Sequence, residues 1–341
     1  MSGSTTAKLT ASEIASLWTS YLNDSMAKCV LGQFLQHIED EAIRSVVQFS
    51  YDLSVNHLER LKVIFHEGDL PQPIGFTEED VNLGASRLFT EIFCLTYVCH
   101  MSKVGMLAYS GFVSMSARED LREYYIAGLI ESAKLYNEST EVALSKGVFV
   151  RSPFVEVAKH IEFIEDKGYM SGYSLLKKQR TLNAVETSHL WINIQTNLMG
   201  MKLALAFAQT STSKNIQNYM LKGKDISKKH MKIFSSTLLD SNIQPPMPAD
   251  ISITNSTTQT FSDKLMMFHM TLLSAAGTGN YSTAAVASQR SDLVINYERL
   301  SVEVAQFAAS GANIMIKEKW LEQPPGMYDK EKMAQLKYDP E

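Results

Sequence analysis

The sequence predicts an all-α protein made of two copies of one four-helix bundle, related by internal duplication. Three observations lead to this prediction. The same residue types recur at a spacing of 172 to 173 residues along the 341-residue chain. Within each copy, apolar residues repeat at helical spacing. Residues that form loops interrupt this pattern at matching places in both copies.

The internal repeat keeps its register across uncommon residue types. Leu17-Trp18 recurs as Leu190-Trp191, and the motif at 118–121 recurs at 290–293 as Arg-x-Asp-Leu. Further matched pairs are Glu13 with Glu186, His57 with His230, Tyr109 with Tyr281, and Glu131 with Glu303. The register slips by one residue between the second and third helices, which is what a duplication with a small loop change produces.

Two long helices are expected at the start of the first copy, at about 10–37 and 40–67. In the second of them Leu53, His57 and Leu61 lie four residues apart and mark one helical stripe. Helices of about 28 residues span roughly 40 Å, a length typical of a four-helix bundle.

An irregular segment with two prolines and two glycines follows at 68–77. Thr77 is expected to cap a third helix that continues to about 114, because its hydroxyl can accept from first-turn N–H groups. Ser116 is expected to cap a fourth helix that ends near 146.

The repeat divides the chain into domains. We expect a first bundle at 9–150, a linker at 151–181, a second bundle at 182–325 and a C-terminal tail at 326–341. Within the linker, a short helical stretch is expected at 155–165, together with Lys-Gly-Tyr and Ser-Gly-Tyr turns.

Composition limits the partners that the protein can have. The net charge is −5 and no long run of Lys or Arg occurs, which argues against nucleic acid or an anionic membrane as the main partner. No stretch reaches the roughly 18 to 20 unbroken apolar residues of a membrane span. The three cysteines all lie in apolar helical segments, which predicts reduced thiols in a cytoplasmic protein.

Ionisable residues recur on apolar helix faces in both copies. Glu13 lies between Leu9 and Leu17 at i±4, and Glu186 lies in the matching place. The other matched residues of this kind are His57, His230, Glu131 and Glu303. A carboxylate facing apolar surface must find a partner or change its protonation, because a buried unpaired charge is costly.

These residues define a candidate metal site in each bundle. His57 with Glu131, and His230 with Glu303, are the ligands we consider, and iron or another divalent transition metal is the candidate cofactor. The Glu-x-x-His spacing of di-iron bundles is missing, because serine stands three residues before each histidine and Lys134 stands three residues after Glu131. The alternative is a buried His or Glu satisfied by a neighbouring Tyr, Asn or Arg.

Glu13 and Glu186 are outlying candidates for the same sites. Counted from the turn near residue 39, Glu13 and His57 differ in level by roughly 12 Å, too far for one metal. His57 and Glu131 lie 18 and 16 residues from their turns, so they can reach similar levels if both turns lie at one end.

Motifs in both halves resemble one bacterial family. The first half carries Leu17-Trp18, the segment 75–82 and Arg87-Leu88-Phe89, and the second carries 261–266 and Trp-Leu-Glu-x-Pro-Pro at 320–325. The chain is similar along most of its length to the family catalogued as domain of unknown function 3231, found in spore-forming Firmicutes. The resemblance implies a tandem pair of ferritin-like bundles in a cytoplasmic or spore-associated protein, and it implies no activity.

Three functions remain open at this level. The first is a non-enzymatic structural or binding module, in which the fused copies mimic a dimer of single bundles and can associate further into a homo-oligomer. The second is a metal-dependent oxidase-like or protective protein with a degenerate carboxylate and histidine site in each bundle. The third is a pocket for a small ligand between the two copies.

Overall fold

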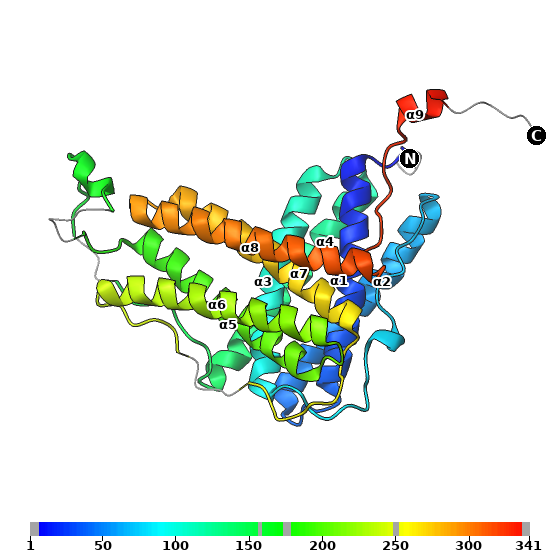
Figure 1. The fold of residues 1–341 in the computed structure, drawn as a ribbon, viewed down its shortest axis with the longest axis horizontal. Helices are drawn as coiled ribbons and strands as arrows, with labels where there is room; N and C mark the ends of the chain where they lie inside the picture. The colour runs from blue at the N-terminus through cyan, green and yellow to red at the C-terminus, as the bar shows by residue number, and fades with distance from the viewer. Residues whose placement is uncertain (1–6, 156–158, 173–178, 248–251, 336–341) are drawn as a thin grey trace, which may run out of the picture.

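The structure is a computed structural model that describes residues 7–155, 159–172, 179–247 and 252–335. Apart from two isolated β-bridges, the regular secondary structure of these residues is helical. The helices form two bundles of four, whose long axes cross in Figure 1. The duplicated all-α fold that the sequence predicts is therefore confirmed.

Each bundle contains four long helices. The first comprises α1 (Ala11–Leu35), α2 (Glu41–Glu67), α3 (Glu91–Met115) and α4 (Glu119–Ser145). The second comprises α5 (Ala184–Thr210), α6 (Lys214–Asp240), α7 (Asp263–Ala287) and α8 (Ser291–Lys317). The short elements are the 3₁₀ turns η1 (Glu78–Asp80) and η2 (Lys167–Met170), and α9 (Lys330–Gln335) in the C-terminal tail.

The third helix begins at Glu91, so the prediction that it begins at Thr77 is wrong. Thr77 caps only η1, and Thr90 caps α3 by accepting from the N–H of Phe93. The residues between η1 and α3 are extended because they pair with the second copy, and a continuous helix would leave that pairing unmade.

The cap of the fourth helix also differs from the prediction. Ser116 ends α3 and its hydroxyl donates to the carbonyl of Phe112, while Arg118 occupies the N-cap position of α4 without a side-chain cap bond. The carboxylate of Glu13 on α1 supplies the missing cap.

The helical stretch predicted at 155–165 is wrong for its described residues, which form no helix. Ile161 and Phe163 are 93% and 89% exposed, so their apolar side chains have no surface to pack against. A short helix without tertiary packing is marginal in water, and a single 3₁₀ turn, η2, forms further along instead.

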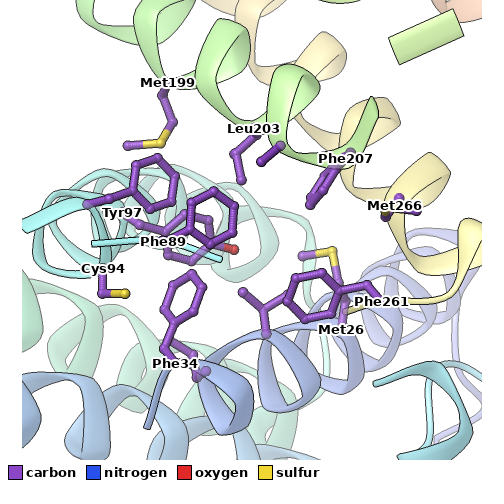
Figure 2. Close-up of a cluster of buried hydrophobic side chains, with 14 of the residues drawn as sticks. Met26, Phe34, Phe89, Cys94, Tyr97, Met199, Leu203, Phe207, Phe261 and Met266 are labelled. Atoms are coloured by element: carbon purple, nitrogen blue, oxygen red, sulfur yellow. The ribbon is translucent and has the colours of Figure 1, made fainter. Parts of the chain in front are cut away.

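Three apolar cores hold the fold together. One lies in the first bundle around Leu17 and Tyr125, and one lies at the matching place in the second bundle around Leu190 and Tyr297. The largest core contains residues of both copies and joins them. Figure 2 shows its centre, where Phe34, Phe89 and Tyr97 meet Leu203, Phe207 and Phe261.

The backbones of the two copies also pair directly. We call residues 80–90 and 252–262 the crossing segments. Val81 bridges Phe261 and Phe89 bridges Ile253 in antiparallel fashion. The N–H of Asn82 donates to the carbonyl of Thr260, and that of Thr254 donates to the carbonyl of Leu88.

The residues that pair occupy equivalent positions in the two copies of the repeat. At an offset of 172 residues, position 81 corresponds to 253 and position 89 to 261, so each bridge maps onto the other. Tyr97 corresponds to His269, and the hydroxyl of Tyr97 lies 3.2 Å from Nε2 of His269. Equivalent residues in contact mark a local two-fold axis, so the copies meet as the subunits of a symmetric dimer would.

Helix α3 is long and apolar enough to cross a membrane by length and composition. The apolar window of this helix is 44% buried inside the fold, where α3 packs on α4 and contributes Tyr97 to the core shared by both copies. Core packing accounts for its apolar composition.

Candidate functional site

A histidine and a glutamate pair inside each bundle. In the first copy, Nε2 of His57 on α2 lies 2.9 Å from Oε2 of Glu131 on α4. In the second copy, Nε2 of His230 on α6 lies 2.9 Å from Oε2 of Glu303 on α8. The structure therefore brings together the four residues that sequence reasoning placed first, two in each half.

The histidines are buried and the glutamates reach the surface. His57 and His230 are 4% and 0% exposed, whereas the side chains of Glu131 and Glu303 are 35% and 29% exposed. Each pair therefore leads from solvent into the interior of its bundle.

A tyrosine from the third helix of each bundle contacts the other ring nitrogen. The hydroxyl of Tyr109 lies 2.9 Å from Nδ1 of His57, and that of Tyr281 lies 3.0 Å from Nδ1 of His230. Both tyrosines are matched in the sequence repeat, which is the signal that could have identified them as members of the cluster.

One residue distinguishes the two clusters. Asp24 on α1 places Oδ1 3.4 Å from Nδ1 of His57. The same position in the second copy is Asn197, whose side-chain amide donates to the hydroxyl of Tyr281 at 2.7 Å. The first cluster thus contains two carboxylates, and the second contains one carboxylate and an amide.

This difference moves the two histidine pKa values in opposite directions. Burial alone would lower the pKa of His57, but hydrogen bonds and charges from Asp24 and Glu131 outweigh it and raise the pKa to about 9. Burial lowers the pKa of His230, and Glu303 offsets only part of that effect. At neutral pH the first cluster therefore holds an imidazolium and the second a neutral imidazole.

In the second cluster, the hydrogen bonds form one continuous chain in which each donor has an acceptor. The amide of Asn197 donates to the oxygen of Tyr281, whose hydroxyl donates to Nδ1 of His230, and Nε2–H of His230 donates to Glu303. Lys229 also lies 2.9 Å from Glu303, so this carboxylate is paired from two sides.

Glu13 and Glu186 lie elsewhere and cap helices. Oε1 of Glu13 accepts from the backbone N–H groups of Ala117 and Arg118 at 2.9 and 2.8 Å, at the start of α4. Oε2 of the same carboxylate accepts from the backbone N–H of Thr10 at 2.7 Å. One carboxylate thus caps two helices, and although burial opposes ionisation, these hydrogen bonds lower the pKa of Glu13.

Glu186 repeats this arrangement in the second bundle. It accepts from the backbone N–H groups of Gln289 and Arg290 at 3.1 and 2.9 Å, and from the guanidinium of Arg180 at 2.7 Å. The recurrence of this glutamate in the sequence therefore has a structural cause, because both α4 and α8 begin with a residue that provides no cap of its own.

The donor set falls short of a transition-metal centre. In each bundle, only two side chains could act as metal ligands together, the imidazole through Nε2 and the glutamate that contacts this nitrogen. Structural and catalytic metal sites use three or four protein ligands. Asp24 cannot complete such a set because it faces the opposite nitrogen of the His57 ring. Across the described residues, no group of three His, Cys, Asp or Glu side chains is arranged to hold a metal ion.

Cavities adjoin the two clusters at equivalent places. The cavity of the first bundle has a volume of about 130 Å³ and is lined by its four helices and by Leu272 of α7, with Asp24, His57 and Tyr109 in its wall. Its counterpart in the second bundle has a volume of about 50 Å³ and includes Asn197 and Tyr281. A further cavity of about 120 Å³ lies between the two copies, beside α3 and α5.

The family model for "Protein of unknown function (DUF3231)" matches residues 3–161 and again residues 170–333. The chain belongs to this family. Its two matches correspond to the two copies of the repeat.

No curated protein matches the chain. A solved structure from Bacillus halodurans C-125, described as a candidate spore coat protein, has 16% sequence identity and a TM-score of 0.40. The similarity covers 44% of this chain and 98% of that one.

Three segments on which the resemblance was based lie at the junction between the copies. Asp80, in the motif at 75–82, accepts from the hydroxyl of Ser262 at 2.6 Å, and Ser262 belongs to the motif at 261–266. Glu322, in the motif at 320–325, accepts from the backbone N–H groups of Ile74 and Gly75 at 2.8 and 2.9 Å. These motifs therefore join the two bundles.

Proposed function

We propose that the protein is a non-catalytic structural and binding module, a fused pair of bundles held in a dimer-like arrangement. The observation that carries this proposal is that protein side chains occupy both ring nitrogens of His57 and of His230. An imidazole held on both sides serves to tie helices together, and in each bundle it links the second, third and fourth helices.

The location of the segments at 75–82, 261–266 and 320–325 supports the same proposal. They fix one copy on the other through Asp80, Ser262 and Glu322. A rigid, fixed orientation of two bundles suits a scaffold or binding module. The cysteines of the chain are buried, and burial raises the pKa of Cys29 to about 12, which favours inert thiols in a reducing cytoplasm.

A metal-binding function is the second candidate. The observation that favours it is the 2.9 Å separation of imidazole nitrogen and carboxylate oxygen in both bundles, with each glutamate partly open to solvent. Iron or another divalent ion would have to find its remaining ligands in water or in an added molecule, because each pair supplies two donors.

Metal analysis separates these candidates. The wild-type chain, purified without chelator and incubated with iron(II) or manganese(II), is compared with a His57→Gln/His230→Gln variant. We expect far less than one metal per bundle in both proteins, and a lower melting temperature for the variant because two interhelical ties are lost. Near-stoichiometric metal that disappears in the variant would overturn the proposal in favour of the second candidate.

A further inference from the structure

The cavity of the first bundle contains a carboxylate oxygen that lacks a donor. Oδ2 of Asp24 is buried and has no hydrogen-bond partner among the described residues, while Oδ1 faces His57. An ionised oxygen left buried without a donor costs free energy, so this position favours a ligand that brings one.

The charged groups beside the cavity favour binding of a cation. Asp24 and Glu131 contribute two negative charges, and the imidazolium of His57, whose pKa is raised to about 9, contributes one positive charge. These three groups sum to one negative charge, and the guanidinium of Arg60 acts on Glu131 from outside the cavity wall. The negative charge in the wall itself is therefore that of Asp24. The cavity wall contains no lysine or arginine among the described residues to cancel it.

The rest of the wall is divided between small polar and apolar side chains. Its hydroxyl groups come from Tyr109 and from five serines, Ser20, Ser50, Ser54, Ser102 and Ser132. Its apolar side includes Met26, Leu53, Met101, Phe112 and Leu135. A ligand with a donor-rich charged end and a short hydrocarbon end would match both.

The volume limits the ligand to a small molecule. At about 130 Å³ the cavity is close to the engineered cavity of about 150 Å³ that binds benzene, so about six non-hydrogen atoms fit. The side chain of Asp24 retains 13% exposure, so the carboxylate lies between the cavity and solvent.

In the second bundle, a larger side chain occupies most of the equivalent space. Phe307 stands where the first copy has Leu135, and Gly223 stands where it has Ser50. A Cβ atom on Gly223 would lie 2.7 Å from Cζ of Phe307, so the phenyl ring needs that glycine. The carboxylate is also replaced there by Asn197, so the equivalent cavity is smaller, at about 50 Å³, and has no carboxylate in its wall.

We propose that the first bundle binds a small primary alkylammonium ion in this cavity, with the ammonium group on Asp24 and the alkyl chain among Met101 and Leu135. The proposal rests on the binding function proposed above and specifies its ligand. An ammonium group fits better than a metal ion, because its three N–H donors match a carboxylate and hydroxyl groups and its alkyl chain occupies the apolar side.

Isothermal titration with n-butylammonium tests the proposal on the full chain at neutral pH, with 1-butanol as the neutral probe of similar size. We expect one equivalent to bind per chain, and 1-butanol to bind at least tenfold more weakly. Asp24→Asn is expected to weaken n-butylammonium at least tenfold, because it removes a charged hydrogen-bond acceptor. Ser50→Gly/Leu135→Phe, which copies the second bundle, is expected to abolish binding.

Equal binding of 1-butanol, binding unchanged by Asp24→Asn, or no saturable binding would overturn the proposal. If a variant fails to fold, nuclear Overhauser contacts between the butyl chain and the methyl group of Met101 in the wild-type chain decide the question. Metal content is measured separately, so a failure here differs from a failure of the proposed function.

Discussion

Asp24 and Asn197 occupy the same position in the two copies, and this single difference sets the charge of two otherwise similar clusters. A carboxylate at Nδ1 stabilises the imidazolium of His57, while in the second copy an amide orients Tyr281 to donate to a neutral His230. Matched residues in the sequence indicated that the histidines matter in both bundles. They could not indicate the charge difference, because the aspartate lies on another helix and its partner is visible only in three dimensions.

Replacing Asp24 with asparagine is expected to convert the first cluster to the second type. The pKa of His57 falls from about 9 to below the ordinary value of 6.5, because burial then outweighs the remaining effect of Glu131. Histidine ring signals followed by NMR through a pH titration measure this shift. A pKa that stays above 8 in the variant would show that Asp24 is not the main cause.

Stability is expected to depend on pH through the same residue. The folded-state pKa of His57 lies above the unfolded value, so its contribution is fully present below pH 6.5 and is lost as pH rises through about 9. The loss is a few kcal/mol at most, and urea unfolding at pH 6.5 and pH 9.5 measures it. In the Asp24→Asn variant the difference between these two pH values is expected to shrink; an unchanged difference would assign it to other groups.

The elements show which parts of the fold local sequence determines. Apolar periodicity and turn residues predicted the bounds of α1 and α2 to within two residues of those observed. Periodicity and capping are local properties, so the sequence alone determines them. Thr77 failed as a start signal because the residues after it pair with a segment 172 residues away, and no local pattern reveals that partner. Glu13 illustrates a similar limit, since its spacing indicated a buried carboxylate but not the distant helix end that it caps.

Removing the shared cap is expected to destabilise two helices at once. Glu13→Ala leaves the N–H groups of Ala117, Arg118 and Thr10 without their acceptor, at a cost of about 3 kcal/mol. Glu13→Gln keeps one acceptor oxygen and is expected to cost less. Urea unfolding followed by circular dichroism measures both, with the exposed Glu59→Ala as control. Equal stability of the alanine variant and the control would contradict the capping role.

At the scale of the whole molecule, the repeat predicted two copies and left their relation open. The structure relates them by a local two-fold axis at which Tyr97 meets His269, its own equivalent. No histidine of the first copy matches His269, so the repeat does not single out this residue. At a two-fold axis, each position contacts its equivalent in the other copy. The two residues can therefore differ in type, as Tyr97 and His269 do.

This symmetry leads to a prediction about the first copy alone. A chain of residues 1–150 would expose Phe34, Phe89 and Tyr97, which the second copy covers in the full chain (Figure 2). Since the crossing segments are equivalent, Val81 of one fragment can pair with Phe89 of another, as it pairs with Phe261 in the full chain. We therefore expect a fragment homodimer by analytical ultracentrifugation, and a monomer after Phe89→Asp. A helical fragment that stays monomeric at high concentration would show that the covalent link, not the complementary surface, holds the copies together.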